Sequence, residues 1–298
     1  MTSTPTVTFT FIRHGESTDN LKSVWAGWKD APLSNHGMNQ AKALGVSLSN
    51  TRVTAIHASP LKRALWTAQA VRNAQKEPQP PLTTSLLLRE QYWGIAEGKP
   101  WIMQMEPGIS LEEHYAKGVY PVLSGRADKF PEGESLDDLA QRAAQAIDEL
   151  AMPYVWQAAR AGESGLNIAI VSHGLCISEL IPALLVKDAS GAHPGHKYKG
   201  LLNTAWTRVT VTVKGAKPGE VLDFLDSQPP PLQVQVTDFN RHEHLDQIAR
   251  QKGGIGSAEF DPKQQDIRAF FGGAAVSMRD TEEGRSESNA RDEVNVDL

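Results

Sequence analysis

The sequence predicts an α/β fold: a three-layer sandwich in which a mostly parallel central sheet is flanked by helices. Three observations predict it. Short apolar runs that resemble buried strands alternate along the chain with segments of helical spacing. Hydrophobic residues make up 40% of the 298 residues, enough for a sizeable core. Charged residues make up 22%, close to the average of globular proteins, which argues against wholesale disorder.

The first part of the chain contains two strand–helix units. Residues 7–12 form a β-rich apolar run, and residues 32–45 have helical spacing, with Ser34 as the expected N-cap. A second apolar run at 53–58 leads into a predicted helix at 61–74, whose apolar positions fall on one face. Each unit therefore provides one strand and one covering helix.

The second part repeats this alternation. Residues 86–88 are expected to form a third strand, and residues 135–150 have strong helical spacing. Residues 167–171 predict a fourth buried strand, followed by a helix from Leu175 onward. Residues 205–213 alternate between apolar and polar positions, as an edge strand does.

Polar clusters follow three of the predicted strands. In α/β sheets of this kind, ligands bind beyond the carboxyl ends of the strands. Three separate clusters at such ends argue for one shared site more strongly than any single polar residue does. The clusters are Arg13-His14-Gly15, Ser59 with Arg63, and Ser172-His173-Gly174.

These residue types suit phosphoryl chemistry. A neutral imidazole such as that of His14 can attack an electrophile when its other ring nitrogen is held as a donor. Phosphoryl transfer needs positive charge on the equatorial oxygens more than it needs further covalent help. Arg13, Arg63, His173 and the hydroxyl group of Ser17 could supply those donors.

Six blocks between residues 7 and 213 support this interpretation as a set. They are residues 11–20 (FIRHGESTDN), 27–37 (GWKDAPLSNHG), 59–68 (SPLKRALWTA), 88–98 (LREQYWGIAEG), 131–135 (PEGES) and 171–174 (VSHG). In content and order they resemble the motifs of the histidine phosphatase superfamily, in its phosphoglycerate-mutase-like branch. A single block is a modestly specific sign of this family, and six blocks in the family's order are a highly specific one.

The resemblance implies a fold of the phosphoglycerate-mutase type and a mechanism. His14 would attack phosphorus and become phosphohistidine, while Arg13, Arg63 and His173 neutralise the phosphoryl oxygens. Glu90 would protonate the leaving alcohol and then accept a proton from water, a dual role that a raised pKa favours. No metal and no cofactor would be needed, since the arginines supply the positive charge.

The resemblance also implies a wider phosphate-binding set. Ser17 and Asn20 would add hydrogen bonds to the phosphate, and Glu97 would act as a structural partner. The full set expected to bind the phosphate comprises Arg13, Ser17, Asn20, Gly27, Arg63, His173 and Asn203.

One departure favours a phosphatase over a mutase. Cofactor-dependent mutases of this family usually follow the acid with Arg-His-Tyr-Gly, whereas here residues 91–94 read Gln-Tyr-Trp-Gly. A mutase must retain a charged intermediate, while a phosphatase need only admit water. We therefore expect hydrolysis of a phosphate monoester. The alternatives are a cofactor-dependent phosphoglycerate-type mutase and a family scaffold reused for binding or for non-phosphate chemistry.

Aromatic residues near these motifs suggest the character of the pocket. Tyr92, Trp93, Trp101 and Trp25 predict aromatic walls, which suit a bulkier or less charged substrate. Residues 100–130 carry no family motif and are expected to cap the site and set its specificity.

The expected domain organisation is one histidine phosphatase domain over residues 1–250, with the specificity insertion near 100–130, and a C-terminal extension over 251–298. The last twenty residues hold three arginines and seven acidic side chains, a net charge of −4, so the extension is expected to be partly disordered.

Composition and charge limit the classes of partner that this protein is expected to bind. The net charge of −5 argues against nucleic-acid binding through bulk charge, and the single cysteine, Cys176, excludes an intrachain disulfide framework. The one apolar span worth testing as a membrane helix, 168–186, contains Glu179, which would cost about 2.5–3.5 kcal/mol near the middle of a bilayer. We therefore expect a cytoplasmic enzyme with a small phosphorylated substrate, no nucleic acid and no membrane partner; the sequence does not specify an oligomeric state.

Overall fold

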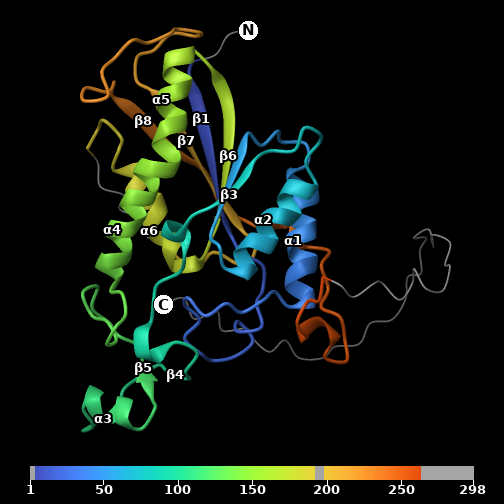
Figure 1. The fold of residues 1–298 in the computed structure, drawn as a ribbon, viewed down its shortest axis with the longest axis vertical. Coiled ribbons are helices and arrows are strands. Elements are labelled where there is room, and N and C mark those ends of the chain that lie inside the picture. Colours follow the sequence, from blue (N-terminus) through green and yellow to red (C-terminus); the bar gives the residue numbers. More distant parts are fainter. Residues whose placement is uncertain (1–3, 192–197, 263–298) are drawn as a thin grey trace, which may run out of the picture.

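Six strands form one central sheet in the computed structural model, which describes residues 4–191 and 198–262 (Figure 1). Their order across the sheet is β3–β2–β6–β1–β7–β8, and β7 alone runs against the others. The predicted α/β class with a mostly parallel sheet is thereby confirmed. The strands are β1 (Thr6–Arg13), β2 (Ala55–Ala58), β3 (Leu82–Thr84), β6 (Ser164–Ser172), β7 (Trp206–Val213) and β8 (Leu232–Arg241).

Helices cover both faces of this sheet. In Figure 1, α1 and α2 lie on one side, and α4, α5 and α6 lie on the other. A π-helical turn, Ile147–Ala151, joins α4 to α5, so the helix predicted at 135–150 continues beyond its expected end. The helices are α1 (Asn35–Leu48), α2 (Lys62–Asn73), α4 (Leu136–Ala146), α5 (Met152–Ala161) and α6 (Gly174–Leu185).

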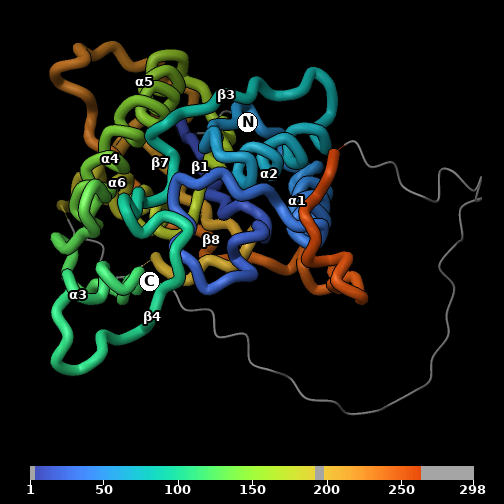
Figure 2. The backbone as a smooth tube through the Cα atoms, turned by 60° about the horizontal axis from the view of Figure 1, so that its bottom comes forward, coloured from blue at the N-terminus to red at the C-terminus, as the bar shows by residue number. Residues whose placement is uncertain are grey.

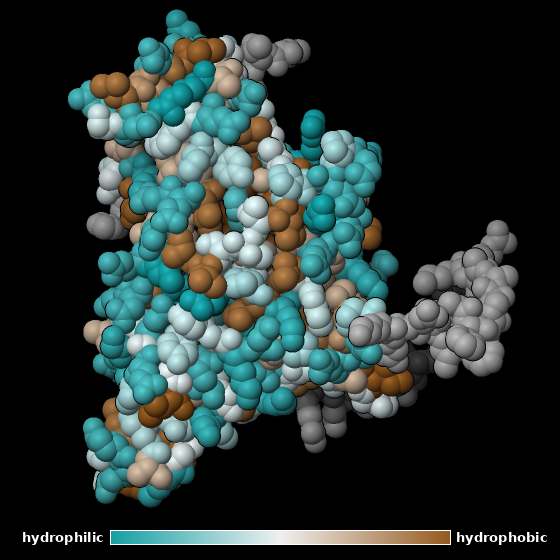
Figure 3. Space-filling view, viewed as in Figure 1, coloured by the Kyte–Doolittle hydropathy of each residue, from teal (hydrophilic) through white to brown (hydrophobic). Residues whose placement is uncertain are grey.

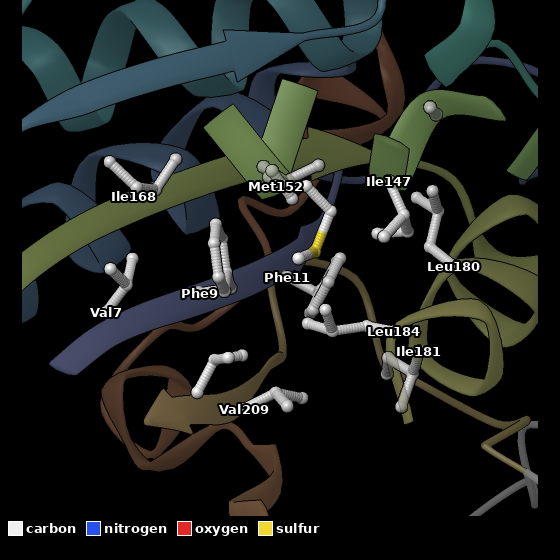
Figure 4. Close-up of a cluster of buried hydrophobic side chains, with 14 of the residues drawn as sticks. Val7, Phe9, Phe11, Ile147, Met152, Ile168, Leu180, Ile181, Leu184 and Val209 are labelled. Carbon is white, nitrogen blue, oxygen red and sulfur yellow. The ribbon is translucent and has the colours of Figure 1, made fainter. Parts of the chain in front are cut away.

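The alternation of side chains along each strand divides the core between the two faces. Phe9 and Phe11 of β1 pack beneath α4, α5 and α6, while Ile12 faces α1 and α2. The larger cluster is drawn in Figure 4, where Met152 lies next to Phe11 and Leu180 next to Ile147. The inner strands are therefore buried on both sides and held rigidly.

Serine caps fix where two of the helices begin. Ser34 accepts a hydrogen bond from the backbone N–H of Gly37, as the sequence predicts. Ser135 forms a reciprocal capping box with Asp138 at the start of α4.

Two predicted strands differ in the structure. Residues 86–88 form a 3₁₀ turn, because the Ser85 hydroxyl group accepts from the N–H of Leu87 and turns the chain; the strand β3 lies four residues earlier. The strand predicted at 205–213 is β7, but it is not an edge strand. β8, which the sequence analysis did not identify, pairs along its outer side.

The chain between 98 and 130 forms a small unit that projects below the sheet in Figure 1. It contains β4 (Trp101–Ile102), β5 (Tyr120–Pro121) and α3 (Leu111–Ala116). An aromatic cluster that includes Trp25 and Phe130 joins this unit to the main domain. Residues 98–130 therefore share their hydrophobic cluster with the main domain.

After β8 the chain returns to the start of α1. The backbone N–H of Asn35 donates to Ala258 O at 2.9 Å, and that of Phe260 donates to Leu33 O at 2.9 Å. Residues 251–262, expected to belong to a separate extension, therefore pack on the main domain. The disorder expected of the tail falls on residues 263–298, outside the described residues.

The surface in Figure 3 carries both hydrophobic and hydrophilic residues. Val221 and Leu225 are exposed in the connection between β7 and β8, at the upper end of Figure 1, and Figure 3 shows hydrophobic atoms there among hydrophilic ones. Within residues 4–191 and 198–262, no helix has the length and apolar character needed to cross a bilayer.

Candidate active site

The three polar clusters of the sequence meet at one edge of the sheet. β1, β6 and β2 are neighbours, and their last residues lie in register, with Arg13 opposite Ser172 and Ala58 opposite Val171. The backbone N–H of His14 donates to Ser172 O at 3.0 Å. The segments that carry His14, Arg63 and His173 therefore leave the sheet side by side.

His14 is held as a neutral imidazole with one free lone pair. Its side chain is 4% exposed, and Nδ1 lies 2.7 Å from the carbonyl oxygen of Gly15, so Nδ1 carries the proton and Nε2 the lone pair. The pKa of His14 lies well below its usual range, because burial disfavours the charged ring and the guanidinium groups of Arg63 and Arg13 repel a further positive charge. This is the protonation state that a nucleophilic histidine requires.

Arg63, near the start of α2, is the buried cation beside His14. Its Nη2 donates to Gly27 O at 2.7 Å, its Nη1 to Lys29 O at 3.0 Å and its Nε to His173 Nδ1 at 3.2 Å. Burial lowers its pKa, and Glu90 is the main charge that opposes this shift. Two carbonyl groups and a ring nitrogen thus fix the guanidinium group where it lines the cavity described below.

Gly27 lies behind Arg63 and does not line that cavity. A Cβ atom there would stand 2.0 Å from Glu97 Oε1 and 2.6 Å from Gln91 O, so the close approach requires glycine. Glu97 in turn accepts from the backbone N–H groups of Trp28, Lys29 and Trp93 at 2.9–3.0 Å. Glu97 therefore shapes the loop whose carbonyl groups hold Arg63, the structural position expected of it.

His173 is buried next to His14, with ring centroids 5.0 Å apart. Its Nδ1 accepts from Arg63, and its Nε2 donates to Ser59 Oγ at 2.8 Å. Its pKa lies well below the usual range, because burial and the charge of Arg63 both disfavour the imidazolium form. Both ring nitrogens are therefore engaged by protein groups, and in this arrangement His173 supports Arg63 and does not line the cavity.

Glu90 brings a carboxyl group to the same cavity from the loop after the 3₁₀ turn at 86–88. It is 8% exposed and accepts from the backbone N–H groups of Gln91 and Cys176, both at 3.0 Å, and of Leu175 at 3.2 Å. Burial raises its pKa, and the hydrogen bond from Gln91 and the charge of Arg63 only partly oppose this. Burial therefore favours the protonated acid, while the first turn of α6 supplies donors to the carboxylate.

The remaining predicted residues divide into two groups. Asn20 and Asn203 line the cavity, and Asn203 Nδ2 donates to the backbone oxygen of His14 at 3.0 Å. Ser17 is buried and does not line it; its hydroxyl group and its backbone N–H both donate to Asn20 Oδ1. Ser17 therefore orients Asn20. Arg13 lines the cavity and donates to Leu201 O.

These groups surround a cavity of about 390 Å³ at the carboxyl edge of the sheet. Its lining is strongly charged and has an aromatic side. The cations are Arg13, Lys22, Arg63, Lys199 and Arg250, the acids are Glu16, Asp19 and Glu90, and the aromatic residues are Trp25, Trp93 and Trp101.

Tyr92, which was expected in the aromatic wall, does not line this cavity. Its ring stacks on Trp28, with centroids 4.5 Å apart. Glu16, Asp19, Lys199 and Arg250 also line the cavity and were not among the residues predicted from the sequence. Glu16 and Asp19 lie within the block that carries His14, whereas no motif marks the other two. Among the described residues, no group of three or more histidine, cysteine or acidic side chains is arranged to hold a metal ion.

Known proteins resemble this chain in sequence. The model of the histidine phosphatase superfamily (branch 1) matches residues 9–218. A probable phosphatase of Schizosaccharomyces pombe is 28% identical over 264 residues, which cover 87% of this chain and 78% of that protein. A 2,3-bisphosphoglycerate-dependent phosphoglycerate mutase of Lactobacillus johnsonii is 30% identical over 188 residues, 57% of this chain and 79% of that one.

A solved structure shares the fold. The mycobacterial glucosyl-3-phosphoglycerate phosphatase superimposes with a TM-score of 0.54 at 21% identity, and the match covers 79% of this chain and 99% of that one. The likeness extends over nearly the whole of the smaller protein. Residues after 218, among them β8 and Arg250, lie beyond the family match.

Proposed function

Since the chain belongs to branch 1 of the histidine phosphatase superfamily, we propose that it hydrolyses a small phosphate monoester through a phosphohistidine intermediate on His14. The observation that carries this proposal is the arrangement of four groups around one cavity. A neutral His14, with its lone pair on Nε2, lines the same cavity as Arg13, Arg63 and the raised-pKa carboxyl group of Glu90.

In the first step, Nε2 of His14 attacks phosphorus. An N–P bond forms while the P–O bond to the alcohol breaks, and the proton of Glu90 passes to the departing oxygen. Arg13 and Arg63 stabilise the charge that spreads over the phosphoryl oxygens, which is the main requirement of such a transfer. The carbonyl group of Gly15 stabilises the ring, which becomes positively charged as Nε2 bonds to phosphorus.

In the second step, Glu90 acts as a base. Its carboxylate accepts a proton from a water molecule, whose oxygen bonds to phosphorus while the N–P bond breaks. Inorganic phosphate leaves, and His14 returns to its neutral form. Burial favours the acid form of Glu90, and the N–H groups of Gln91, Leu175 and Cys176 stabilise the carboxylate, so one side chain can serve both steps.

The residues after Glu90 favour hydrolysis over a mutase reaction. Gln91 is buried and donates to Glu134 O at 2.7 Å, and Tyr92 stacks on Trp28. Neither side chain adds a charge to the cavity for a retained bisphosphate. The probable phosphatase of Schizosaccharomyces pombe also matches more of this chain than the mutase of Lactobacillus johnsonii does.

A trapping experiment tests the proposal. The enzyme is mixed with a panel of phosphate monoesters, quenched in base and analysed by mass spectrometry, while released phosphate is measured in parallel. We expect inorganic phosphate and an acid-labile phosphoryl adduct on His14. Isomerisation of phosphoglycerate without phosphate release would instead indicate the mutase. A panel without turnover and without an adduct would contradict both and favour a reused scaffold.

Replacing Gly27 with alanine tests the support of Arg63. The new methyl group must displace Glu97 or the loop at residues 27–29, so the carbonyl groups that hold Arg63 move away from it. We expect kcat/KM for phosphate esters to fall about 10- to 100-fold, as misplacement of a charged group by about 1 Å does. We also expect a loss of stability of about 1–3 kcal/mol, measured by urea denaturation.

Gly215→Ala is the matched control for this variant. Gly215 has a φ of +82° but nothing within 4 Å of an added Cβ, and it lies in the turn after β7, away from the cavity. It should lose stability through backbone strain alone and keep its kcat/KM. Equal activity losses in the two variants would mean that the Gly27 contact does not position Arg63.

A further inference from the structure

We propose that Arg250 is a specificity-determining residue, which selects phosphate esters whose alcohol part carries a second anionic group, a carboxylate or a phosphate. The inference rests on the proposed function and names its substrate class. Arg250 lines the cavity that contains His14, yet it comes from the segment after β8, beyond residue 218 where the family match ends. Arg250 therefore lies outside the part of the chain that the family model describes.

Arg250 is held by a carboxylate at the edge of the cavity. Its Nη1 donates to Glu16 Oε1 at 3.0 Å and to Ser257 Oγ at 3.2 Å, and its Nη2 donates to Glu16 Oε2. Such a two-point contact fixes the plane of a guanidinium group and keeps it charged. Because the group carries five N–H donors on a flat fork, an arginine anchored along one side can also donate to a ligand.

The contact positions Arg250 more than it positions Glu16. Glu16 already accepts from the Ser34 hydroxyl group at 2.6 Å, its backbone N–H donates to Gln40 Oε1 at 2.9 Å, and its backbone oxygen accepts from the N–H of Ser34 at 2.9 Å. The loop after His14 therefore keeps three anchors without Arg250. The guanidinium group of Arg250, in contrast, is held at the cavity by its hydrogen bonds to Glu16 and Ser257.

The segment that carries Arg250 is itself anchored. Asn35 Nδ2 donates to Ile255 O at 2.9 Å, the N–H of Asn35 donates to Ala258 O, and the ring of Phe260 packs edge-on against Trp66. In Figures 1 and 2 this segment lies beside α1, and the insertion that carries Trp101 lies on the other side of the loop after β1. The cavity is therefore bordered by the insertion with its aromatic residues on one side and by the segment of Arg250 on the other.

The charges of the cavity are consistent with a second anion. Arg13 and Arg63 lie with His14 and are assigned to the transferred phosphoryl group. Lys22 is paired with Asp19 at 3.2 Å. Arg250 and Lys199 are the further cations of the lining. A substrate with one phosphate only would use the first pair, and Arg250 would then serve only to hold Glu16 and Ser257.

Three aryl phosphates of one shape test this inference. Phenyl phosphate has no second anion, 4-carboxyphenyl phosphate adds a carboxylate, and 1,4-phenylene bisphosphate adds a phosphate. We expect the wild type to prefer the two esters with a second anion. Arg250→Gln should lower kcat/KM for these two by about tenfold or more, the loss expected for a charged hydrogen bond. It should change phenyl phosphate less than about twofold, and Arg250→Lys should restore part of the preference.

The matched control is Arg160→Gln. Arg160 also pairs with a carboxylate, that of Asp226, but it lies on α5 and does not line the cavity. It should leave all three rates unchanged. A fall of the same size for all three esters in Arg250→Gln would indicate a structural role and overturn the inference. So would an unchanged preference, or a wild type that prefers phenyl phosphate. If only one of the two anionic esters depends on Arg250, that ester identifies the anion.

A second readout separates this inference from the proposed function. If the wild type cleaves none of the esters, the proposed function fails, and binding still tests Arg250. Calorimetry of the three esters with His14→Ala, with and without Arg250→Gln, should show tighter binding of the anionic esters that depends on Arg250. Equal affinities for the three esters would overturn the inference. Thermal melting of each variant verifies that it is folded.

Discussion

Replacing His14 with alanine should lower kcat/KM for phosphate esters by about 10⁴- to 10⁶-fold, the loss seen when an enzyme loses its nucleophile. This corresponds to about 5–8 kcal/mol of activation free energy. Nε2 of His14 is the group that forms the bond to phosphorus, and the adjacent ring of His173 cannot replace it, since Arg63 and Ser59 occupy both of its nitrogens. The phosphoryl adduct should disappear in the same variant.

His242→Ala is the control for this loss. His242 is exposed after β8 and does not line the cavity, so its removal should leave both the rate and the adduct unchanged. If His14→Ala retained hydrolysis within about tenfold of the wild type while Glu90 remained essential, the phosphohistidine step would be wrong. That result would favour direct attack by water or non-phosphate chemistry in the same cavity.

Glu90→Gln is expected to give the second largest effect, a loss of about 10²- to 10⁴-fold, the range of general acid–base catalysis. The size of the loss should depend on the leaving group. An alkyl alcohol needs a proton as it leaves, whereas 4-nitrophenolate leaves without one. The variant should therefore lose much more activity toward glycerol phosphate than toward 4-nitrophenyl phosphate. Equal losses on both esters would contradict the role of Glu90 as the acid.

The pH dependence of kcat/KM tests the roles of Glu90 and His14 independently of the leaving group. The first step needs Glu90 protonated and His14 neutral. Because the pKa of Glu90 is raised, activity is present at low pH and falls as pH rises through that raised value. Because the pKa of His14 is lowered, its ring stays neutral until the pH falls well below the usual range of histidine. Because of these two pKa shifts, protonated Glu90 and neutral His14 are populated over the same pH range.

Glu90→Gln should flatten the alkaline limb of this profile. Glutamine does not titrate, so the decline that the wild type shows through the raised pKa of Glu90 should vanish. The second ionisation of the ester is the same for both enzymes, so the difference between the two profiles belongs to Glu90. If Glu90→Gln kept the decline at high pH, a group other than Glu90 would be responsible for it.

The electrostatics of the cavity explain why these effects should be large. Arg63 acts on both reactive groups: its charge lowers the pKa of His14 and opposes the rise in the pKa of Glu90. It is buried and anchored by carbonyl oxygens, so its charge is oriented before a substrate arrives. A cation held in advance in a water-poor site stabilises a transition state without the cost of reorganisation.

Much of the fold could be predicted from patterns in short stretches of the sequence. Apolar runs predict β1, β2 and β6, alternating polarity predicts β7, and helical spacing predicts α4 and, with the Ser34 cap, α1, because burial and capping act over a few residues. β3 was placed four residues too late, since the leucines at 86–88 are equally compatible with a strand and a turn. β8 was missed, and β7 was therefore predicted as an edge, because strand pairing joins segments distant in sequence.

The sequence by itself determined the family and the sheet type, and it predicted the reactive groups, because the blocks around His14, Arg63, Glu90 and His173 are local motifs of fixed residue type. Only the tertiary structure decided what each one touches. It places His173 and Gly27 behind Arg63, turns Tyr92 away from the cavity, and brings Arg250 across more than 230 residues to Glu16. Protonation states, cavity walls and charge partners depend on burial and on contacts between distant segments, and neither property is encoded in any short stretch of the chain.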